Sequence, residues 1–132
     1  MILLDTHVLL WLVFENDRLG TRTRGFIDAA LDGAGVGLST ISFWETSMLV
    51  QRGRVEVADV HAFRNDVLAL GITETPVTGD IAIAAGSLEG LHGDPADRIV
   101  VATAVVRGMT LVTADEAILR WKRTLSRIDA RR

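Results

Sequence analysis

The sequence lacks several residue types and patterns on which whole classes of protein depend. It has no cysteine, which excludes a disulfide framework, a thiol nucleophile and a zinc site built on thiolates. No apolar run approaches the length of a membrane span. An acid at position 5, with no basic residue before it, does not fit a secretory signal. These absences predict a soluble, cytoplasmic protein that does not interact with membranes.

The chain also lacks the short motifs of several enzyme classes. The patterns G-x-x-x-x-G-K-S/T, G-x-G-x-x-G and G-x-S-x-G are all missing, so nucleotide-binding loops and serine-hydrolase elbows have no support. A phosphoacceptor domain of the receiver type needs paired acids after its first strand and a late lysine. Here Asp5 has no acidic neighbour, and the only lysine, Lys122, lies beyond the last candidate acid. The formal charge of −3 argues against a protein that coats nucleic acid by bulk charge, although it allows an enzyme that binds its own cations.

What remains is an apolar chain of 132 residues, which predicts a single domain over residues 1–132 with a substantial core. Short apolar runs alternate with helical patterns along its whole length. Strands are predicted at Ile2–Leu4, Val36–Leu38, Ile72–Val77, Thr110–Val112 and Ser126–Ile128. Pro76 indicates that the third is an edge strand or that it marks the end of a strand, and the last is interpreted as an edge strand. Helices are predicted at Thr6–Phe14, Thr21–Leu31, Ile41–Val50, Asp59–Leu70, Asp80–Leu88, Ile99–Val106 and Glu116–Trp121. The alternation indicates an α/β fold, a three-layer α/β/α sandwich with a mainly parallel central sheet.

Acidic residues follow the apolar runs at regular places. The four that matter are Asp5, Glu45, Asp97 and Asp115. In a parallel sheet all of these places lie at the carboxyl edge, where α/β proteins bind their ligands. Four carboxylates gathered there would repel one another strongly, so we expect a hard divalent cation, Mg²⁺ or Mn²⁺, among them. The ordinary alternative for the first acid is that Asp5 or Thr6 simply caps the first helix.

The other acids also have structural interpretations. Asp94 followed by a proline has the form of a helix N-cap, which accounts for Asp94 without any chemistry. Asp97 is harder to explain in this way, because it aligns with an apolar stripe of its helix and a carboxylate there needs a partner. Glu45 is flanked by apolar residues at helical spacing, and a site role and a surface role both stay open for it. Asp115 is either a site residue or the cap of the last helix.

The histidines and the basic C-terminus give weaker signals. His7, beside a carboxylate at a helix start, is interpreted as a structural, hydrogen-bonded side chain. His61 and His92 form no spaced metal-binding pair with any other residue. Basic residues crowd the C-terminus: Arg120, Lys122, Arg123, Arg127, Arg131 and Arg132. We interpret this run as a solvated, partly frayed tail, with a track for phosphates as the alternative.

Four segments together resemble the PIN-domain family, and more narrowly the VapC-type toxins of bacterial type II toxin–antitoxin systems. The segments are Leu3–Trp11, Ser39–Glu45, Gly93–Arg98 and Leu111–Asp115. They span nearly the whole chain in the family's order. The resemblance implies a carboxylate cluster that holds Mg²⁺ or Mn²⁺ and an endoribonuclease that cleaves RNA with a metal-activated water. It also implies a cognate antitoxin protein as partner and a homodimer.

The resemblance assigns roles to individual residues. Asp5, Glu45, Asp97 and Asp115 match the family's four acids in order, and Thr113 matches the hydroxyl residue that commonly precedes the last acid and supports the site. The alternative function is that of a catalytically weak or inactive PIN-like binding module, which predicts no cleavage by the purified protein.

Two further residues of the third motif stay open. Asp94 belongs to the D-P-x-D-R variant of the motif and is expected to cap the helix or to support the site from outside, as Thr6 does on the first helix. Arg98 is either a phosphate or antitoxin contact or the surface partner of a nearby acid. Gly93 departs from the family, because this subgroup often has a basic residue there. The RNA target and the number of metal ions are left open by the sequence.

Overall fold

The computed structural model describes residues 1–132 as five strands and seven helices that alternate along the chain. The strands are β1 (Ile2–Leu4), β2 (Val36–Ser39), β3 (Thr73–Thr75), β4 (Thr110–Thr113) and β5 (Arg127–Asp129). The helices are α1 (Thr6–Val13), α2 (Thr21–Asp32), α3 (Ile41–Gln51), α4 (Val60–Ala69), α5 (Gly79–Gly86), α6 (Pro95–Arg107) and α7 (Glu116–Arg120). Every predicted element is present. The apolar part of α6 is predicted from Ile99, and the start of the helix at Pro95 confirms the prediction that Asp94 caps this helix with the proline at its first position.

The strands form one parallel sheet in the order β3-β2-β1-β4-β5. All three residues of β1 are apolar and buried, which suits a central strand covered on both faces. The predictions that β3 and β5 are edge strands are confirmed. Because all strands run in the same direction, the segments that follow them begin at one edge of the sheet.

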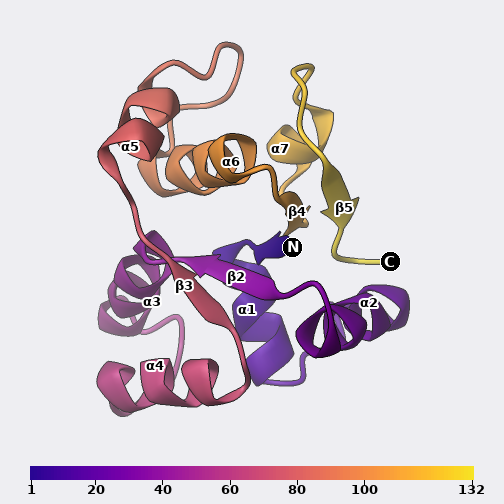
Figure 1. The fold of residues 1–132 in the computed structure, drawn as a ribbon. Coiled ribbons are helices and arrows are strands. Elements are labelled where there is room, and N and C mark those ends of the chain that lie inside the picture. Colours follow the sequence, from indigo (N-terminus) through magenta and orange to yellow (C-terminus); the bar gives the residue numbers. More distant parts are fainter.

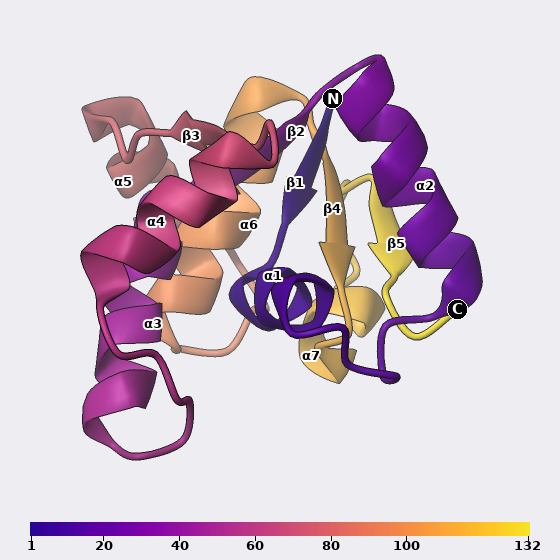
Figure 2. The ribbon, with the colours of Figure 1, turned by 90° about the horizontal axis from the view of Figure 1, so that it is seen from below.

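Helices cover both faces of this sheet (Figures 1 and 2). Ile2 and Leu4 pack into one core cluster together with Leu9 of α1. Leu3 points to the opposite face and packs into a second cluster with Val100 of α6. This alternation follows from the two-residue period of a strand, and the two clusters confirm the predicted three-layer α/β/α sandwich.

The arginine-rich C-terminus is held firmly against the rest of the molecule. β5 pairs with β4, and the residues after β5 bond to the start of α2. The Gly20 N–H donates to the Ala130 carbonyl at 2.9 Å, and the Thr23 N–H donates to the Arg132 carbonyl at 2.8 Å. A Cβ on residue 20 would lie 1.9 Å from the Arg132 carbonyl oxygen, so this close approach requires glycine. The prediction of a frayed tail is therefore wrong.

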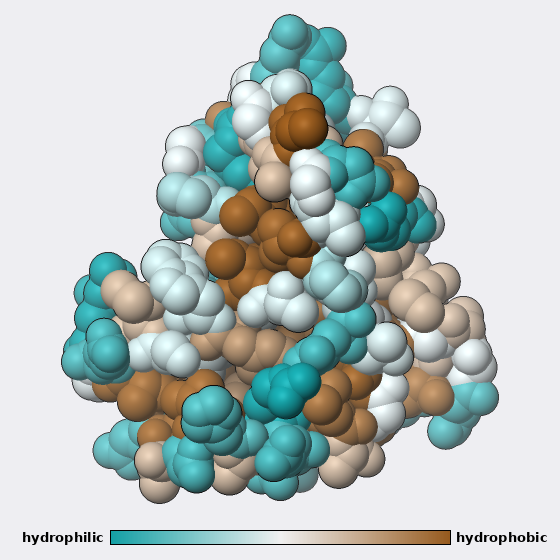
Figure 3. Space-filling view, turned by 60° about the vertical axis from the view of Figure 1, so that its left-hand side comes forward, coloured by the Kyte–Doolittle hydropathy of each residue, from teal (hydrophilic) through white to brown (hydrophobic).

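The surface carries apolar side chains on the face of α3, α4 and α5, where Figure 3 shows apolar areas between hydrophilic ones. Trp44 of α3 and Ile83 of α5 are 54% and 76% exposed. Apolar side chains that gather on a surface mark contacts with other proteins. No helix combines the length and the apolar character that crossing a bilayer would require.

Candidate metal centre

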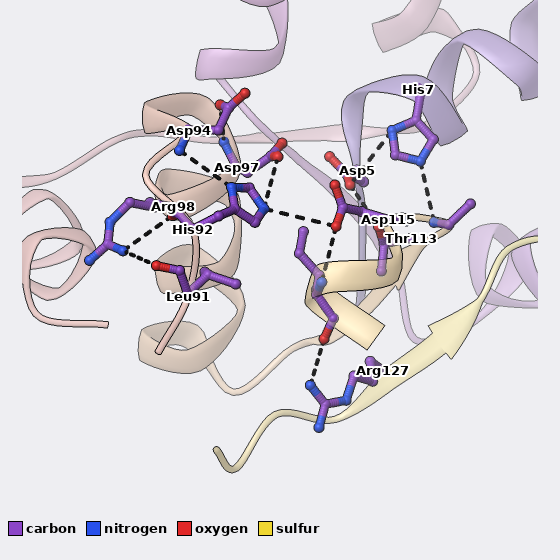
Figure 4. Close-up of polar contacts among 12 residues, drawn as sticks. Asp5, His7, Leu91, His92, Asp94, Asp97, Arg98, Thr113, Asp115 and Arg127 are labelled. Carbon is purple, nitrogen blue, oxygen red and sulfur yellow. Dashed lines mark hydrogen bonds and ion pairs between the residues drawn. The ribbon is translucent and has the colours of Figure 1, made fainter. Parts of the chain in front are cut away.

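Four acidic side chains from four different elements meet at the carboxyl edge of the sheet. Asp5 follows β1, Asp115 follows β4, Glu45 lies in α3, and Asp97 lies in the first turn of α6. The charges of the other three all contribute to raising the pKa of Asp97. Figure 4 shows Asp5, Asp97 and Asp115 pointing toward a common space beside His92. The structure brings together the acids that the sequence singled out.

Asp5 is the most buried of the four, with 1% of the residue exposed. One of its oxygens accepts a hydrogen bond from the Thr6 N–H at 2.8 Å, and the other accepts from the Thr113 hydroxyl at 2.7 Å. The same hydroxyl oxygen accepts from the Asp115 N–H at 3.1 Å. Thr113 thus fixes the carboxylate after β1 relative to the backbone after β4. Asp5 caps α1 and also lies in the cluster, so both interpretations of it apply.

Asp97 and Asp94 divide two tasks between them. The Asp94 carboxylate accepts from the Asp97 N–H at 3.1 Å and caps α6, as predicted. The Asp97 side chain is 16% exposed, and burial, followed by the charges of the surrounding acids, raises its pKa to about 8. At neutral pH this carboxyl keeps its proton unless a cation compensates the cluster.

Glu45 is the acid with the least support from the protein. Its Oε1 atom is buried and has no hydrogen-bond partner. Burial raises the pKa of Glu45, the charges of Asp5 and Asp94 add to the rise, and the nearby Thr6 hydroxyl opposes it. A buried carboxylate oxygen without a donor costs stability, and such a group is typical of a site that awaits a ligand.

His92 completes the cluster, so the prediction that it forms no metal-binding set with other residues is wrong. Its Nε2 atom lies 3.5 Å from Asp97 Oδ2 and 3.9 Å from Asp115 Oδ1. One ligand atom from each of these three residues lies within 4.8 Å of the others. The available signal was position, because His92 directly precedes the capped start of α6 and so belongs to the same edge of the sheet.

The hydrogen bond at Nδ1 of His92 determines which ring nitrogen carries the proton. The Asp94 N–H donates to His92 Nδ1 at 3.3 Å, so the neutral ring carries its proton on Nε2. That proton faces the carboxylates of Asp97 and Asp115. The Nε2 atom of His92 is nevertheless buried without a hydrogen-bond partner, as Glu45 Oε1 is, so two polar atoms of the cluster are left unsatisfied by the protein.

His7 lies beside the cluster and has a structural role, as predicted. Its Nε2 atom accepts from the Ala114 N–H at 3.2 Å, and its Nδ1 atom lies 3.7 Å from Asp5 Oδ2. The ring therefore connects α1 with the segment after β4.

Arg98 braces the loop that carries His92 (Figure 4). Its Nε donates to the Ala85 carbonyl at 2.9 Å, and Nη1 donates to the carbonyls of Leu91 and His92 at 3.0 and 3.3 Å. The guanidinium forms an ion pair with no acid, so the prediction that Arg98 is the surface partner of a nearby acid is wrong. A phosphate or antitoxin contact through its remaining N–H groups stays a prediction.

The donor set as a whole fits a hard divalent cation. It consists of carboxylate oxygens, one of them buried without a partner, and the protein supplies no arginine or lysine to neutralise them. Oxygen ligands of this kind are those that Mg²⁺ and Mn²⁺ prefer. Burial first, and the charges of the neighbouring acids second, raise the pKa values of Glu45 and Asp97, and a cation among these carboxylates would oppose both effects.

Comparison with known proteins agrees with this geometry. The PIN domain family model matches residues 2–123. Ribonuclease VapC22 of Mycobacterium tuberculosis is 31% identical over 118 residues, which are 89% of this chain and 88% of that protein. A toxin–antitoxin complex from Klebsiella pneumoniae contains a chain with a TM-score of 0.66 and 19% identity, over 98% of both chains. VapBC2 from Rickettsia felis, bound to a DNA fragment from its promoter, gives a TM-score of 0.69 and 16% identity, over 98% of this chain and 100% of that chain.

The two solved structures establish the fold alone, since their identities are low. The family match and the relative at 31% identity cover nearly the whole chain. This protein therefore belongs to the PIN-domain family, within its VapC group.

Proposed function

We propose that this protein is a Mg²⁺-dependent endoribonuclease, with Mn²⁺ as an alternative ion, and that it is the toxin of a type II toxin–antitoxin pair in the cytoplasm. The observation that carries the proposal is the meeting of four acids in one place, where the pKa of Asp97 is raised to about 8. Such a cluster destabilises the fold unless it has a ligand, so its presence is best explained by a function. The homologue's name, ribonuclease VapC22, supports RNA as the substrate.

Asp5, Asp97, Asp115 and Glu45 are the residues that would hold the ion. When bound, the ion neutralises the phosphate oxygens and lowers the pKa of the water that attacks phosphorus. Thr113 and the Thr6 N–H hold Asp5 in one orientation for this purpose.

Glu45 and Asp115 are the two candidates for the general base, and the surroundings of Glu45 favour it. Its Oε1 atom is buried without a partner and its pKa is raised, so it is able to accept a proton from the attacking water. The new bond joins the water oxygen to phosphorus, and the bond from phosphorus to the 3′ oxygen breaks. The departing oxygen takes a proton from solvent, which leaves a 5′-phosphate and a 3′-hydroxyl.

The test is RNA cleavage by the purified protein, free of any partner, with Mg²⁺, Mn²⁺ or a chelator. We expect cleavage only with a metal, and a loss of about 10²- to 10³-fold in Asp5→Asn and in Asp97→Asn. Asp66→Asn, an exposed acid on α4, is the matched control. Cleavage that survives both chelation and the site substitutions would contradict the proposal. A folded wild-type protein that cuts no RNA with either ion would favour the rival function, a PIN-like binding module.

An antitoxin partner and a homodimer belong to the same proposal. The structural neighbours include toxin–antitoxin complexes, and an acid cluster complements an arginine from a partner. The exposed Trp44 and Ile83 offer apolar contact area for such assemblies. Light scattering of the protein with and without its partner measures both, and a monomer that stays free when mixed with the cognate antitoxin would contradict them.

A further inference from the structure

A second polar region lies on the far side of α7 from the acid cluster. It is a cleft of about 570 Å³ between α2, α7 and β5, which we call the arginine cleft. Its lining includes Arg22, Phe26, Glu116, Arg127, Arg131 and Arg132.

The charges of this cleft are only partly neutralised. Arg131 pairs with two carboxylates, Glu116 at 2.6 Å and Asp129 at 2.9 Å. The other three arginines have no carboxylate within ion-pair distance: Arg22, Arg127 and Arg132. A chain with a formal charge of −3 thus presents a concave surface with excess positive charge.

The walls of the cleft are fixed by the contacts that tie the C-terminal segment down. The Thr23 side chain donates to the Asp129 carbonyl at 3.2 Å, in addition to the bond between the Thr23 N–H and Arg132. Arg127 Nη1 donates to the Ile118 carbonyl at 2.7 Å (Figure 4). Phe26 is 46% exposed on α2, so an aromatic side chain stands free beside the guanidinium groups.

We propose that the arginine cleft binds a single-stranded stretch of the RNA substrate next to the point of cleavage, an inference that rests on the proposed function. The guanidinium groups of Arg22 and Arg132, together with the N–H groups of Arg127 that do not bond to Ile118, contact phosphates, and Phe26 stacks on a base. Phosphate contacts from arginine combined with an aromatic platform are how proteins bind unpaired strands.

The position of the cleft favours RNA as its ligand. Asp115 of the acid cluster caps α7, and the carbonyl of Ile118 in the same helix holds Arg127 (Figure 4). A helix of five residues is about 7.5 Å long, so a strand with one phosphate at the acids reaches the cleft within a few nucleotides. The acid cluster by itself repels a polyanion, and the cleft supplies the missing attraction.

The first test measures binding without cleavage. A 5′-labelled single-stranded RNA of about 12 nucleotides is titrated with the full-length protein in the presence of a chelator, and fluorescence anisotropy is recorded at several salt concentrations. For the double variant Arg22→Ala/Arg132→Ala we expect at least a tenfold loss of affinity and a salt slope reduced by about 1 to 2. Phe26→Ala should weaken binding several-fold at an unchanged slope. Arg52→Ala, an exposed arginine at the end of α3, is the control and should leave both quantities unchanged. Circular dichroism verifies that each variant is folded.

The second test uses cleavage kinetics with the metal present. The double variant should raise KM and leave kcat unchanged, because the cleft binds substrate away from the reacting phosphate. If the double variant matches Arg52→Ala in RNA affinity, the inference is overturned. It is also overturned if the double variant keeps its RNA affinity but loses binding of a polyglutamate peptide, which would assign the cleft to an acidic protein partner. A wild-type protein that binds RNA through these arginines yet never cuts it would support the cleft while contradicting the proposed nuclease.

Discussion

The acid cluster and the arginine cleft lie on either side of α7 and treat their carboxylates in opposite ways. In the cleft, the hydrogen bonds from Arg131 hold the pKa of Asp129 below its usual range. In the acid cluster, burial and neighbouring charges raise the pKa of Asp97 to about 8. Arg131 and Asp129 stabilise each other's charged form in the free protein. The carboxylates of the cluster are instead held together against their mutual repulsion.

This difference separates acids that belong to the fold from acids that belong to a function. The chain has seventeen acidic residues, so the position of one of them near a strand is weak evidence for a role in function. What distinguishes Glu45 and Asp97 is that both are partly buried and neither is neutralised by an arginine or lysine. Sites that bind ligands commonly cost stability in the free protein, and here the cost is electrostatic.

The substitution Asp97→Asn should separate function from stability and give the largest effect. It removes one charge from the cluster, so metal-dependent cleavage should fall about 10²- to 10³-fold, as described above. In the metal-free protein the same change should increase the free energy of unfolding. The folded-state pKa lies above the unfolded one, so the folded protein binds more protons between about pH 4 and pH 8 and loses stability as the pH rises through this window.

Urea unfolding in chelator measures this second effect. The gain of Asp97→Asn over the wild type should reach about 1 to 3 kcal/mol at pH 8, after allowance for partial solvent screening, and should vanish near pH 4. Asp66→Asn should show no such trend. A gain that is equal at both pH values would mean that packing, and not charge, destabilises the cluster.

The second largest effect on stability is expected at Gly20, where the C-terminal segment that lines the arginine cleft contacts the start of α2. Gly20→Ala places a Cβ against the Arg132 carbonyl, where the backbone must move. We expect a loss of about 1 to 3 kcal/mol in the free energy of unfolding, together with weaker RNA binding by the arginine cleft. Gly25→Ala, inside α2 and with open space around its Cβ, should instead gain about 0.5 to 1 kcal/mol. Equal effects of the two substitutions would show that the C-terminal segment does not rest on α2 in solution.

A third substitution addresses the link between the carboxylates of the cluster. Thr113→Val removes the hydroxyl that donates to Asp5 and accepts from the Asp115 N–H, and it keeps the side-chain shape. The free energy of unfolding should fall by about 1 to 2 kcal/mol and kcat by about tenfold, since Asp5 loses its orientation. Thr110→Val lies on the same strand at its other end, where the hydroxyl meets only the exposed Ser126, and kcat should not change. A kcat effect shared by both variants would assign the role to β4 as a whole.

The fold and the meeting of the four acids at one edge of the sheet could be predicted from the sequence, because both follow from local patterns. Apolar runs give the strands, a parallel sheet aligns their ends, and so Asp5 and Asp115 are placed before any contact is known. Asp97 follows from its position just inside a capped helix. These inferences need only the register of each element relative to the sheet.

What the sequence did not predict depends on how loops and termini meet. His92 lies in a loop, so its approach to Asp97 could not be read from any period. The arginine cleft arises because Arg132 reaches the start of α2, more than a hundred positions away in the chain. The charge pattern of the C-terminus is the same for a frayed tail as for a docked one. Only the glycine at position 20 distinguishes them, and its meaning depends on the contact itself.

The smallest expected effect concerns Asp129 of the arginine cleft, and it is measured as for Asp97, by the pH dependence of the free energy of unfolding. Arg131→Ala removes the partner of Asp129 and Glu116. Because the pKa of Asp129 is lowered in the folded state, its contribution to stability is present at neutral pH and is lost as the pH falls through its folded-state value. The variant should therefore be slightly less stable than the wild type at pH 7 and equal to it near pH 3. High salt should shrink the difference, since the pair is exposed. Arg123→Ala, which breaks a single exposed pair with Glu89, should change stability less at every pH. Urea unfolding at both pH values measures the change in the free energy of unfolding. At neutral pH this change should be a loss for Arg131→Ala and a gain for Asp97→Asn, if carboxylates stabilise the cleft and destabilise the cluster.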